Sequence, residues 1–136
     1  MGDAKQELVK NWLSKARREL DSAIRLASGP DPLLDTAIYH CQQSAEKALK
    51  GWLTYYDQRF EKTHDVRMLV TLAVALQPDF ANWFNAAESL TPYATAYRYP
   101  GETFEPEPSE FESALQMSQG LYRFILSSLP PEVHPS

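Results

Sequence analysis

The amino-acid sequence predicts an all-α protein, an antiparallel up-and-down bundle of four long helices plus one short helix. In five blocks of the chain, apolar residues recur every three or four positions, which is the period of an amphipathic helix. No block alternates apolar and polar residues with a period of two, so we expect no sheet. Proline and glycine separate the blocks. We therefore expect one helical domain over residues 1–136, with residues 130–136 as a disordered tail.

The first two helices are expected over residues 4–27 and 32–57. Gly29 is suited to end the first helix, while Asp31 and Pro32 are suited to the N-cap and first turn of the second. A helical projection of the second helix separates an apolar core face from a polar face. The core face includes Cys41, Ala45, Leu49 and Trp52, and the polar face consists of Tyr39, His40, Gln43, Glu46, Lys47, Lys50 and Thr54.

The remaining three helices follow in order. A short third helix is expected after Thr63-His64-Asp65, where Thr63 or Asp65 provides the N-cap. A fourth helix is expected from about residue 79 to residue 97, and Pro92 should kink it or split off its last turn. After a proline-rich loop, Ser109 and nearby acids open the fifth helix.

Composition narrows the classes of function. No apolar run approaches the ~20 residues of a membrane span, and the N-terminus lacks the apolar core of a signal peptide, so we expect a cytoplasmic protein without a membrane partner. A net charge of −5 argues against broad, non-specific binding to nucleic acid. Cys41 is the only cysteine and the three histidines lack metal-ligand spacing, so we expect no metal and no cofactor.

The polar face of the second predicted helix is the candidate functional site. His40, Gln43, Lys47 and Lys50 form a stripe that is chemically suited to a phosphate, with the lysines as point charges and Gln43 orienting the ligand. The alternative is an ordinary solvated face that carries one stabilising Glu46–Lys50 pair at i,i+4. Helical spacing alone favours this alternative, because charged faces of helices are usually solvated surfaces that bind no ligand.

The stretch YHCQQSAEKALK, residues 39–50, resembles the signature helix of the HEPN domain family. Thr63-His64-Asp65 before the third helix and Arg98-Tyr99-Pro100-Gly101 after the fourth also match that family, in the right order. The resemblance covers about residues 4–129. It implies an all-α fold that commonly dimerises. It further implies links to nucleotide binding and, in bacteria, pairing with a minimal nucleotidyltransferase, sometimes as toxin and antitoxin.

From this resemblance we expect a non-catalytic module that forms a homodimer, docks a nucleotidyltransferase and binds a nucleotide or phosphate. The expected ligand-binding residues are Gln43, Glu46, Lys47, Lys50, His64 and Arg98. The order of elements permits one polar pocket for Lys47, Lys50 and His64, whereas the sequence leaves open whether Arg98 returns to the same end. Two of them also have structural alternatives. His64 is suited to local packing at a helix start, and Arg98 to complementing the dipole at a helix end.

The alternative function is a metal-independent ribonuclease, the toxin of a toxin–antitoxin pair. The resemblance implies it because one branch of the family carries an arginine, four to six residues, and then a histidine. Arg59 and His64 fit this spacing and would supply charge stabilisation and acid–base chemistry. They precede the third helix, however, whereas the family motif belongs on a later helix. RNA is thus a ligand only under this alternative, and a non-enzymatic role is favoured.

Overall fold

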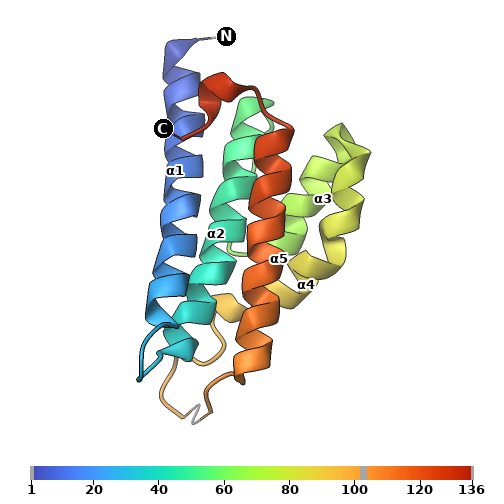
Figure 1. Ribbon diagram of the computed structural model, residues 1–136. Coiled ribbons are helices and arrows are strands. Elements are labelled where there is room, and N and C mark those ends of the chain that lie inside the picture. The colour runs from blue at the N-terminus through green and yellow to red at the C-terminus, as the bar shows by residue number, and fades with distance from the viewer. Residues whose placement is uncertain (1, 102–103, 136) are drawn as a thin grey trace.

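The computed structural model describes residues 2–101 and 104–135, and within these ranges every regular element is helical (Figure 1). The prediction of an all-α bundle is therefore confirmed. The α-helices are α1 (Asp3–Leu26), α2 (Leu34–Tyr55), α3 (Val66–Leu76), α4 (Phe84–Leu90) and α5 (Pro108–Ser127). Three short 3-10 helices, η1 (Pro78–Trp83), η2 (Thr91–Ala94) and η3 (Pro131–Val133), complete the fold.

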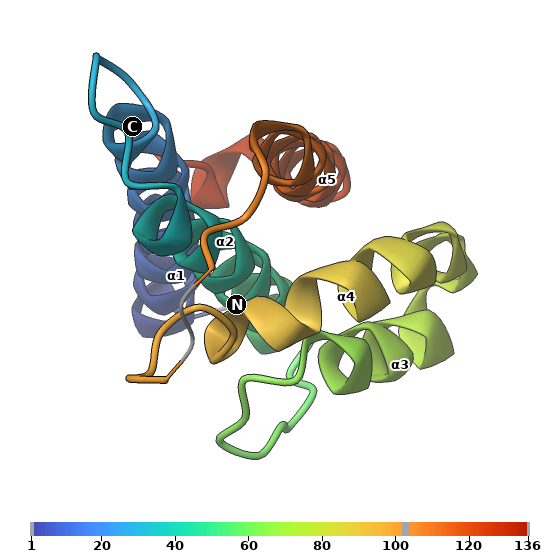
Figure 2. The same cartoon turned by 90° about the horizontal axis from the view of Figure 1, so that it is seen from below.

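The central element is α2, which contacts each of the other four α-helices. Figure 2 shows α1 on one side of it and α3, α4 and α5 on the other. Most of its predicted core face is buried, including Cys41, Leu49 and Trp52, whereas Tyr56 at its end is 43% exposed. Gly51 allows α1 to approach closely, since a Cβ at this position would lie only 3.0 Å from Trp12 Cβ. The position of α2 explains why its sequence is rich in small residues.

Three buried hydroxyl groups cross the interfaces between α1, α2 and α5, and each donates to a backbone carbonyl. The bonds are Ser44 Oγ to Ala16 O at 2.8 Å, Ser118 Oγ to Cys41 O at 2.7 Å and Tyr122 OH to Leu13 O at 3.3 Å. They satisfy polar groups that would otherwise be costly to bury. Figure 1 shows that α1 runs antiparallel to both α2 and α5, so two of these bonds join helices of opposite direction.

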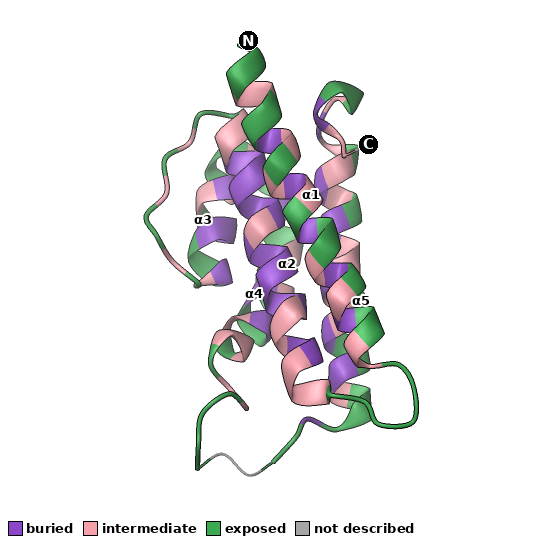
Figure 3. Ribbon diagram, turned by 90° about the vertical axis from the view of Figure 1, so that its left-hand side faces the viewer, coloured by how far each residue is buried: buried purple, intermediate pink, exposed green. Residues whose placement is uncertain are grey.

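A long loop over residues 57–65 makes the bundle less regular than a strict up-and-down arrangement. The loop starts at Asp57, which has a left-handed φ of 56°, and then returns along α2 (Figure 3). His64 is hydrogen-bonded to Gln42 and Glu46, about halfway along α2, before α3 begins. As a result, α3 starts beside the middle of α2 rather than beside its end.

The expected fourth helix, residues 79–97, is broken into η1, α4 and η2. Pro92 lies in the first turn of η2, so the prediction that it would split off the last turn is confirmed. The winding of η1 was not predicted. Its Phe80 is fully buried, with its ring centroid 4.6 Å from that of Trp52. The 3-10 helix η1 thus occurs together with a tertiary contact, although a 3-10 helix of this length is not favoured by the local sequence alone.

The disordered tail expected over residues 130–136 is corrected for its described part, residues 130–135. Residues Pro131–Val133 form η3, and Val133 is fully buried. His134 Nε2 lies 2.8 Å from Leu126 O and 3.0 Å from Leu129 O, at the end of α5. An apolar anchor and an imidazole near the last carbonyls of a helix hold this segment against the bundle.

The N-cap of α3 is Asp65, one of the two predicted candidates. Its Oδ1 accepts hydrogen bonds from the backbone N–H groups of Arg67 at 3.0 Å and Met68 at 3.4 Å. The Arg67 guanidinium also donates to the Asp65 carboxylate, and this bond lowers the pKa of Asp65. The cap fixes the point where the 57–65 loop becomes helix.

We expect Asp65→Ala to lower the free energy of unfolding by about 1 kcal/mol, the usual cost of losing a helix N-cap. Because the folded-state pKa of Asp65 is lowered, its contribution is present above the unfolded-state pKa and is lost as the pH falls through the folded-state value. Urea denaturation at pH 7 measures the change. Asp65→Asn is the matched control, since asparagine also caps, and an equal loss in both variants would contradict the role of the cap.

Candidate anion-binding site

The polar stripe of α2 is largely buried rather than solvated. The relative exposures of Gln43, Glu46 and Lys50 are 7%, 4% and 8%. The stripe is contacted from two sides, by α1 and by the 57–65 loop. Both of these segments are distant in sequence from the residues of α2 that they contact. The alternative of an ordinary solvated face is therefore wrong for these three residues.

The first group of polar contacts is the Glu46 cluster, which consists of Gln42, Glu46, Lys50 and His64. Lys50 Nζ donates to Glu46 Oε2 at 2.9 Å, and His64 Nδ1 lies 2.8 Å from Glu46 Oε1. Gln42 Nε2 donates to Glu46 Oε1 at 3.2 Å and to the His64 carbonyl at 2.9 Å. Gln43 joins indirectly, because its Nε2 donates to Gln42 Oε1 at 2.7 Å. One buried carboxylate thus holds both α2 and the loop.

Two aromatic rings flank the Lys50 ammonium. Its Nζ lies 5.8 Å from the ring centroid of Trp12 on α1 and 5.9 Å from that of Phe60 on the loop. The two rings meet edge to face, with centroids 6.5 Å apart. A cation beside aromatic faces gains cation–π attraction, which is larger where water is excluded. The aromatic pair therefore helps to retain a charged lysine in a buried position.

A pocket of about 380 Å³ opens above the Glu46 cluster, and it is lined by Lys50, Lys62, Thr63 and His64. The His64 side chain is 71% exposed, so its ring is accessible although its Nδ1 is bound to Glu46. These lining residues carry two ammonium groups, an imidazole and a hydroxyl. Such a set offers several donors and a positive charge, which suits a phosphate or another oxyanion.

Lys47 does not contribute to this pocket. Its Nζ donates to Glu19 Oε2 on α1, and His40 Nδ1 lies 2.5 Å from the other oxygen of the same carboxylate. We call Glu19, His40 and Lys47 the Glu19 cluster. Glu19 is 28 residues from Lys47, so no local pattern in the sequence indicated this partner.

Arg98 also lies away from the Glu46 cluster. Its guanidinium carbon stacks 3.6 Å from the ring centroid of Tyr39, and the Tyr39 ring meets that of His40 edge to face at 5.3 Å. Arg98 is thus associated with the Glu19 cluster through Tyr39. The structure brings together Gln43, Glu46, Lys50 and His64 of the predicted set, and places Lys47 and Arg98 in a second group.

The segment before Arg98 is held by a group of residues that the sequence analysis missed. Tyr93 OH donates to Glu110 Oε2 at 2.5 Å, and Tyr97 OH donates to Glu110 Oε1 at 3.1 Å. Burial and the Glu110 carboxylate raise the pKa of Tyr93. Tyr97 has a left-handed φ of 67°, which is unusual for an aromatic residue. These bonds fix the backbone immediately before Arg98.

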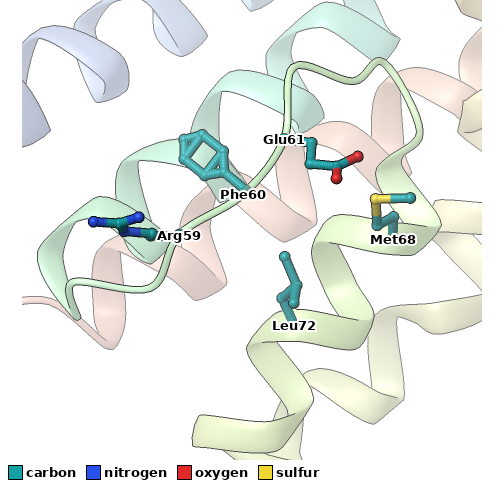
Figure 4. Close-up of a pocket in the computed structure, with 5 residues that line it drawn as sticks. All are labelled: Arg59, Phe60, Glu61, Met68 and Leu72. Atoms are coloured by element: carbon teal, nitrogen blue, oxygen red, sulfur yellow. The ribbon is translucent and has the colours of Figure 1, made fainter.

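Arg59 and His64, the residues of the ribonuclease alternative, line different pockets. In Figure 4, Arg59 lies beside Phe60 and Glu61 in a hollow that faces α3. His64 instead lines the pocket above the Glu46 cluster. His64 is also bound to Glu46 through Nδ1. The short sequence spacing therefore does not translate into a shared pocket.

Other chemistry that the sequence analysis considered can be stated briefly. Cys41 is fully buried, as its predicted core position requires, and burial raises the pKa of its thiol to about 12. Among the described residues, no three His, Cys, Asp or Glu side chains are grouped to hold a metal ion. None of the described helices is both long and apolar enough to cross a membrane.

Comparisons with known proteins identify the family of the chain and agree with its helical fold. The family model described as HEPN domain matches residues 9–129. The crystal structure of TT1696 from Thermus thermophilus is 28% identical, with 89% of this chain and 98% of that chain covered and a TM-score of 0.70. The crystal structure of ST0689, an archaeal HEPN homologue, shares the fold at 24% identity, with 88% and 96% covered and a TM-score of 0.68. No curated protein matches the chain.

Proposed function

This chain belongs to the HEPN domain family, and from that premise we propose that it is a non-catalytic helical module that binds a nucleotide through its phosphates. In this proposal the module acts in the cytoplasm, forms a homodimer and docks a minimal nucleotidyltransferase, in some cases as part of a toxin–antitoxin pair. The ligand enters the pocket lined by Lys50, Lys62, Thr63 and His64.

The observation that supports the ligand proposal is the position of two hydrogen-bonding side chains, Lys50 and His64, which line the pocket and are both bound to the buried Glu46. Glu46 holds Lys50 and His64 in place before any ligand arrives, which reduces the ordering cost of binding. Lys62 lines the pocket, is exposed, and has no ion-pair partner among the described residues. Glu46 neutralises Lys50, so the charge of Lys62 is the positive charge that remains at the pocket. A phosphate group would be attracted to this charge.

Lys47 and Arg98 have a different role in this proposal. Both are associated with the Glu19 cluster, where Lys47 is neutralised by Glu19 and Arg98 stacks on Tyr39. We assign them to holding α1, α2 and the segment after η2 together. The ligand contacts fall to Lys50, Lys62 and His64, with Gln43 and Glu46 orienting them from below.

We expect ATP at millimolar concentration to raise the melting temperature of the purified protein by several degrees, because a ligand that binds only the folded state stabilises it. Lys62→Ala should abolish most of this rise, and Lys62→Arg should retain it. Lys62 is exposed, so neither change should affect folding. Lys47→Ala is the control outside the pocket: it will lower the melting temperature itself but should leave the ATP-dependent rise intact.

Two outcomes would overturn the ligand proposal. Either ATP and inorganic phosphate both leave the melting temperature unchanged, or Lys62→Ala responds to ATP as the wild type does. We do not adopt the ribonuclease alternative, because Arg59 and His64 line separate pockets. RNA cleavage that is lost in both Arg59→Ala and His64→Ala would reinstate it. Co-purification from the native host is the test of the nucleotidyltransferase partner.

A further inference from the structure

A hollow of about 480 Å³ lies between the 57–65 loop and α3, on the face marked in Figure 4. We call it the Phe60 hollow. It is lined by Arg59, Phe60, Glu61, Met68 and Leu72. Three of these lining side chains are apolar and two are charged. No part of the proposed ligand pocket overlaps with it, because the lining residues of the two are all different.

The apolar surface extends beyond this hollow. Met68 is 44% exposed, and Leu76, two turns further along α3, is 47% exposed. On the other side, Arg59 also lines a second hollow of about 430 Å³, which contains Leu8 with an exposure of 49%. Exposed apolar side chains therefore occur on α1 and on α3, in or next to two hollows that share Arg59 of the 57–65 loop. Exposed apolar groups of this kind commonly mark protein interfaces.

The charges on this face show a pattern. Lys5 pairs with Asp57 at 2.9 Å, and Arg67 pairs with Asp65 at 3.1 Å. Arg59 and Glu61, by contrast, form no ion pair or side-chain hydrogen bond within residues 2–101 and 104–135.

Figure 4 shows Arg59 and Glu61 on the loop, on either side of Phe60, with Glu61 near Met68 on α3. The face therefore carries one unpaired charge of each sign, separated by apolar surface.

We propose that the occupant of this face is a second copy of the chain, related to the first by a twofold axis that lies between Phe60 and Met68. Met68 of each copy enters the Phe60 hollow of the other, and Glu61 of each copy pairs with the partner's Arg59. This inference rests on the dimerisation in the proposed function and adds the face that forms the dimer. Methionine suits the role, because its flexible side chain fills irregular apolar gaps.

The self-complementary charges favour a second copy over another protein. In a twofold interface the same patch occurs on both partners, so a contact from residue i to residue j is always repeated from j to i. One arginine and one glutamate that both line the same hollow, on either side of Phe60, meet this requirement and give two ion pairs per dimer.

The experiment is sedimentation equilibrium of the full chain, with Arg59→Glu, Glu61→Arg and an equimolar mixture of the two variants. Either variant alone places like charges against each other twice, and we expect the dimer dissociation constant to rise at least about tenfold. In the mixture, both contacts again join opposite charges, so a heterodimer of near wild-type affinity should form. Arg123→Glu, an exposed charge reversal on α5, is the matched control and should leave the dissociation constant unchanged.

The outcomes separate this face from the dimerisation that it rests on. A wild-type chain that stays monomeric at all concentrations overturns both. A wild-type dimer that persists unchanged in Arg59→Glu overturns the face alone, and dimerisation elsewhere on the chain stands. A mixture that fails to associate, when each variant alone is monomeric, overturns the pairing of Arg59 with the partner's Glu61. Recovery of the dimer in the mixture supports the whole inference.

Discussion

Replacement of Glu46 by alanine is expected to lower the free energy of unfolding by about 3–5 kcal/mol, the usual cost of breaking a buried ion pair from one side. The side chains of Glu46 and Lys50 are only 5% and 10% exposed. Without the carboxylate, the Lys50 ammonium stays in a poorly hydrated position, and His64 and Gln42 lose their shared acceptor. Urea denaturation followed by circular dichroism measures the change.

The matched control removes both charges. Glu46→Leu combined with Lys50→Met should be much less destabilised than the sum of the two single changes, because no uncompensated charge is left in the interior. A double-mutant cycle gives the coupling between the two positions. If Glu46→Ala alone costs less than about 1 kcal/mol, water reaches the carboxylate and the cluster adds little to stability.

We expect Trp52→Ala to cost about 3–5 kcal/mol, as the deletion of a large buried aromatic side chain usually does. Trp52 is 1% exposed and lies where α2, η1 and the end of α5 meet. Its ring centroid is 4.4 Å from that of Tyr56 and 4.6 Å from that of Phe80, and its Nε1 donates to Ser128 Oγ at 3.1 Å. The cavity would remove contacts from three elements at once.

Trp52→Phe separates packing from hydrogen bonding. It keeps an aromatic ring against Phe80 but lacks the indole N–H, so a smaller loss is expected than for the alanine variant. Thermal unfolding followed by circular dichroism compares the two variants under one condition. Equal losses for phenylalanine and alanine would mean that the indole N–H bond and the full indole shape, rather than the buried area, dominate at this site.

Most of the fold could be predicted from the sequence, because helical periodicity and helix-breaking residues are local signals. The approximate positions of α1, α2, α3 and α5, the N-cap at Asp65 and the break at Pro92 follow from residues within one or two turns. The start of α2 differs, since it begins at Leu34 rather than after the expected N-cap Asp31. The winding of η1 and the ordered segment around Val133 could not be predicted in this way. Both accompany apolar contacts with elements far away in the sequence.

The candidate site was predictable in composition but not in grouping. Helical spacing predicts the polar stripe of α2, but it does not predict the residues outside α2 that separate the stripe into two clusters. Glu19 on α1 pairs with Lys47 and His40, and the 57–65 loop places His64 against Glu46. A projection of a single helix cannot show which side chains a second helix or a loop will neutralise. The burial of Glu46 and Lys50 therefore emerges only from the tertiary structure.

The hydroxyl bonds between α1, α2 and α5 have a consequence for the alignment of these helices. The three helices meet largely through small and aliphatic side chains, and a slip by part of one turn, less than the helical pitch of about 5.4 Å, would still place apolar residues against apolar residues. After such a slip, the hydroxyls of Ser44, Ser118 and Tyr122 would lose their carbonyl partners within the interior. Each unsatisfied buried group costs about 1–3 kcal/mol. We infer that these hydroxyls select one register among several of similar packing energy, and so make the native arrangement unique.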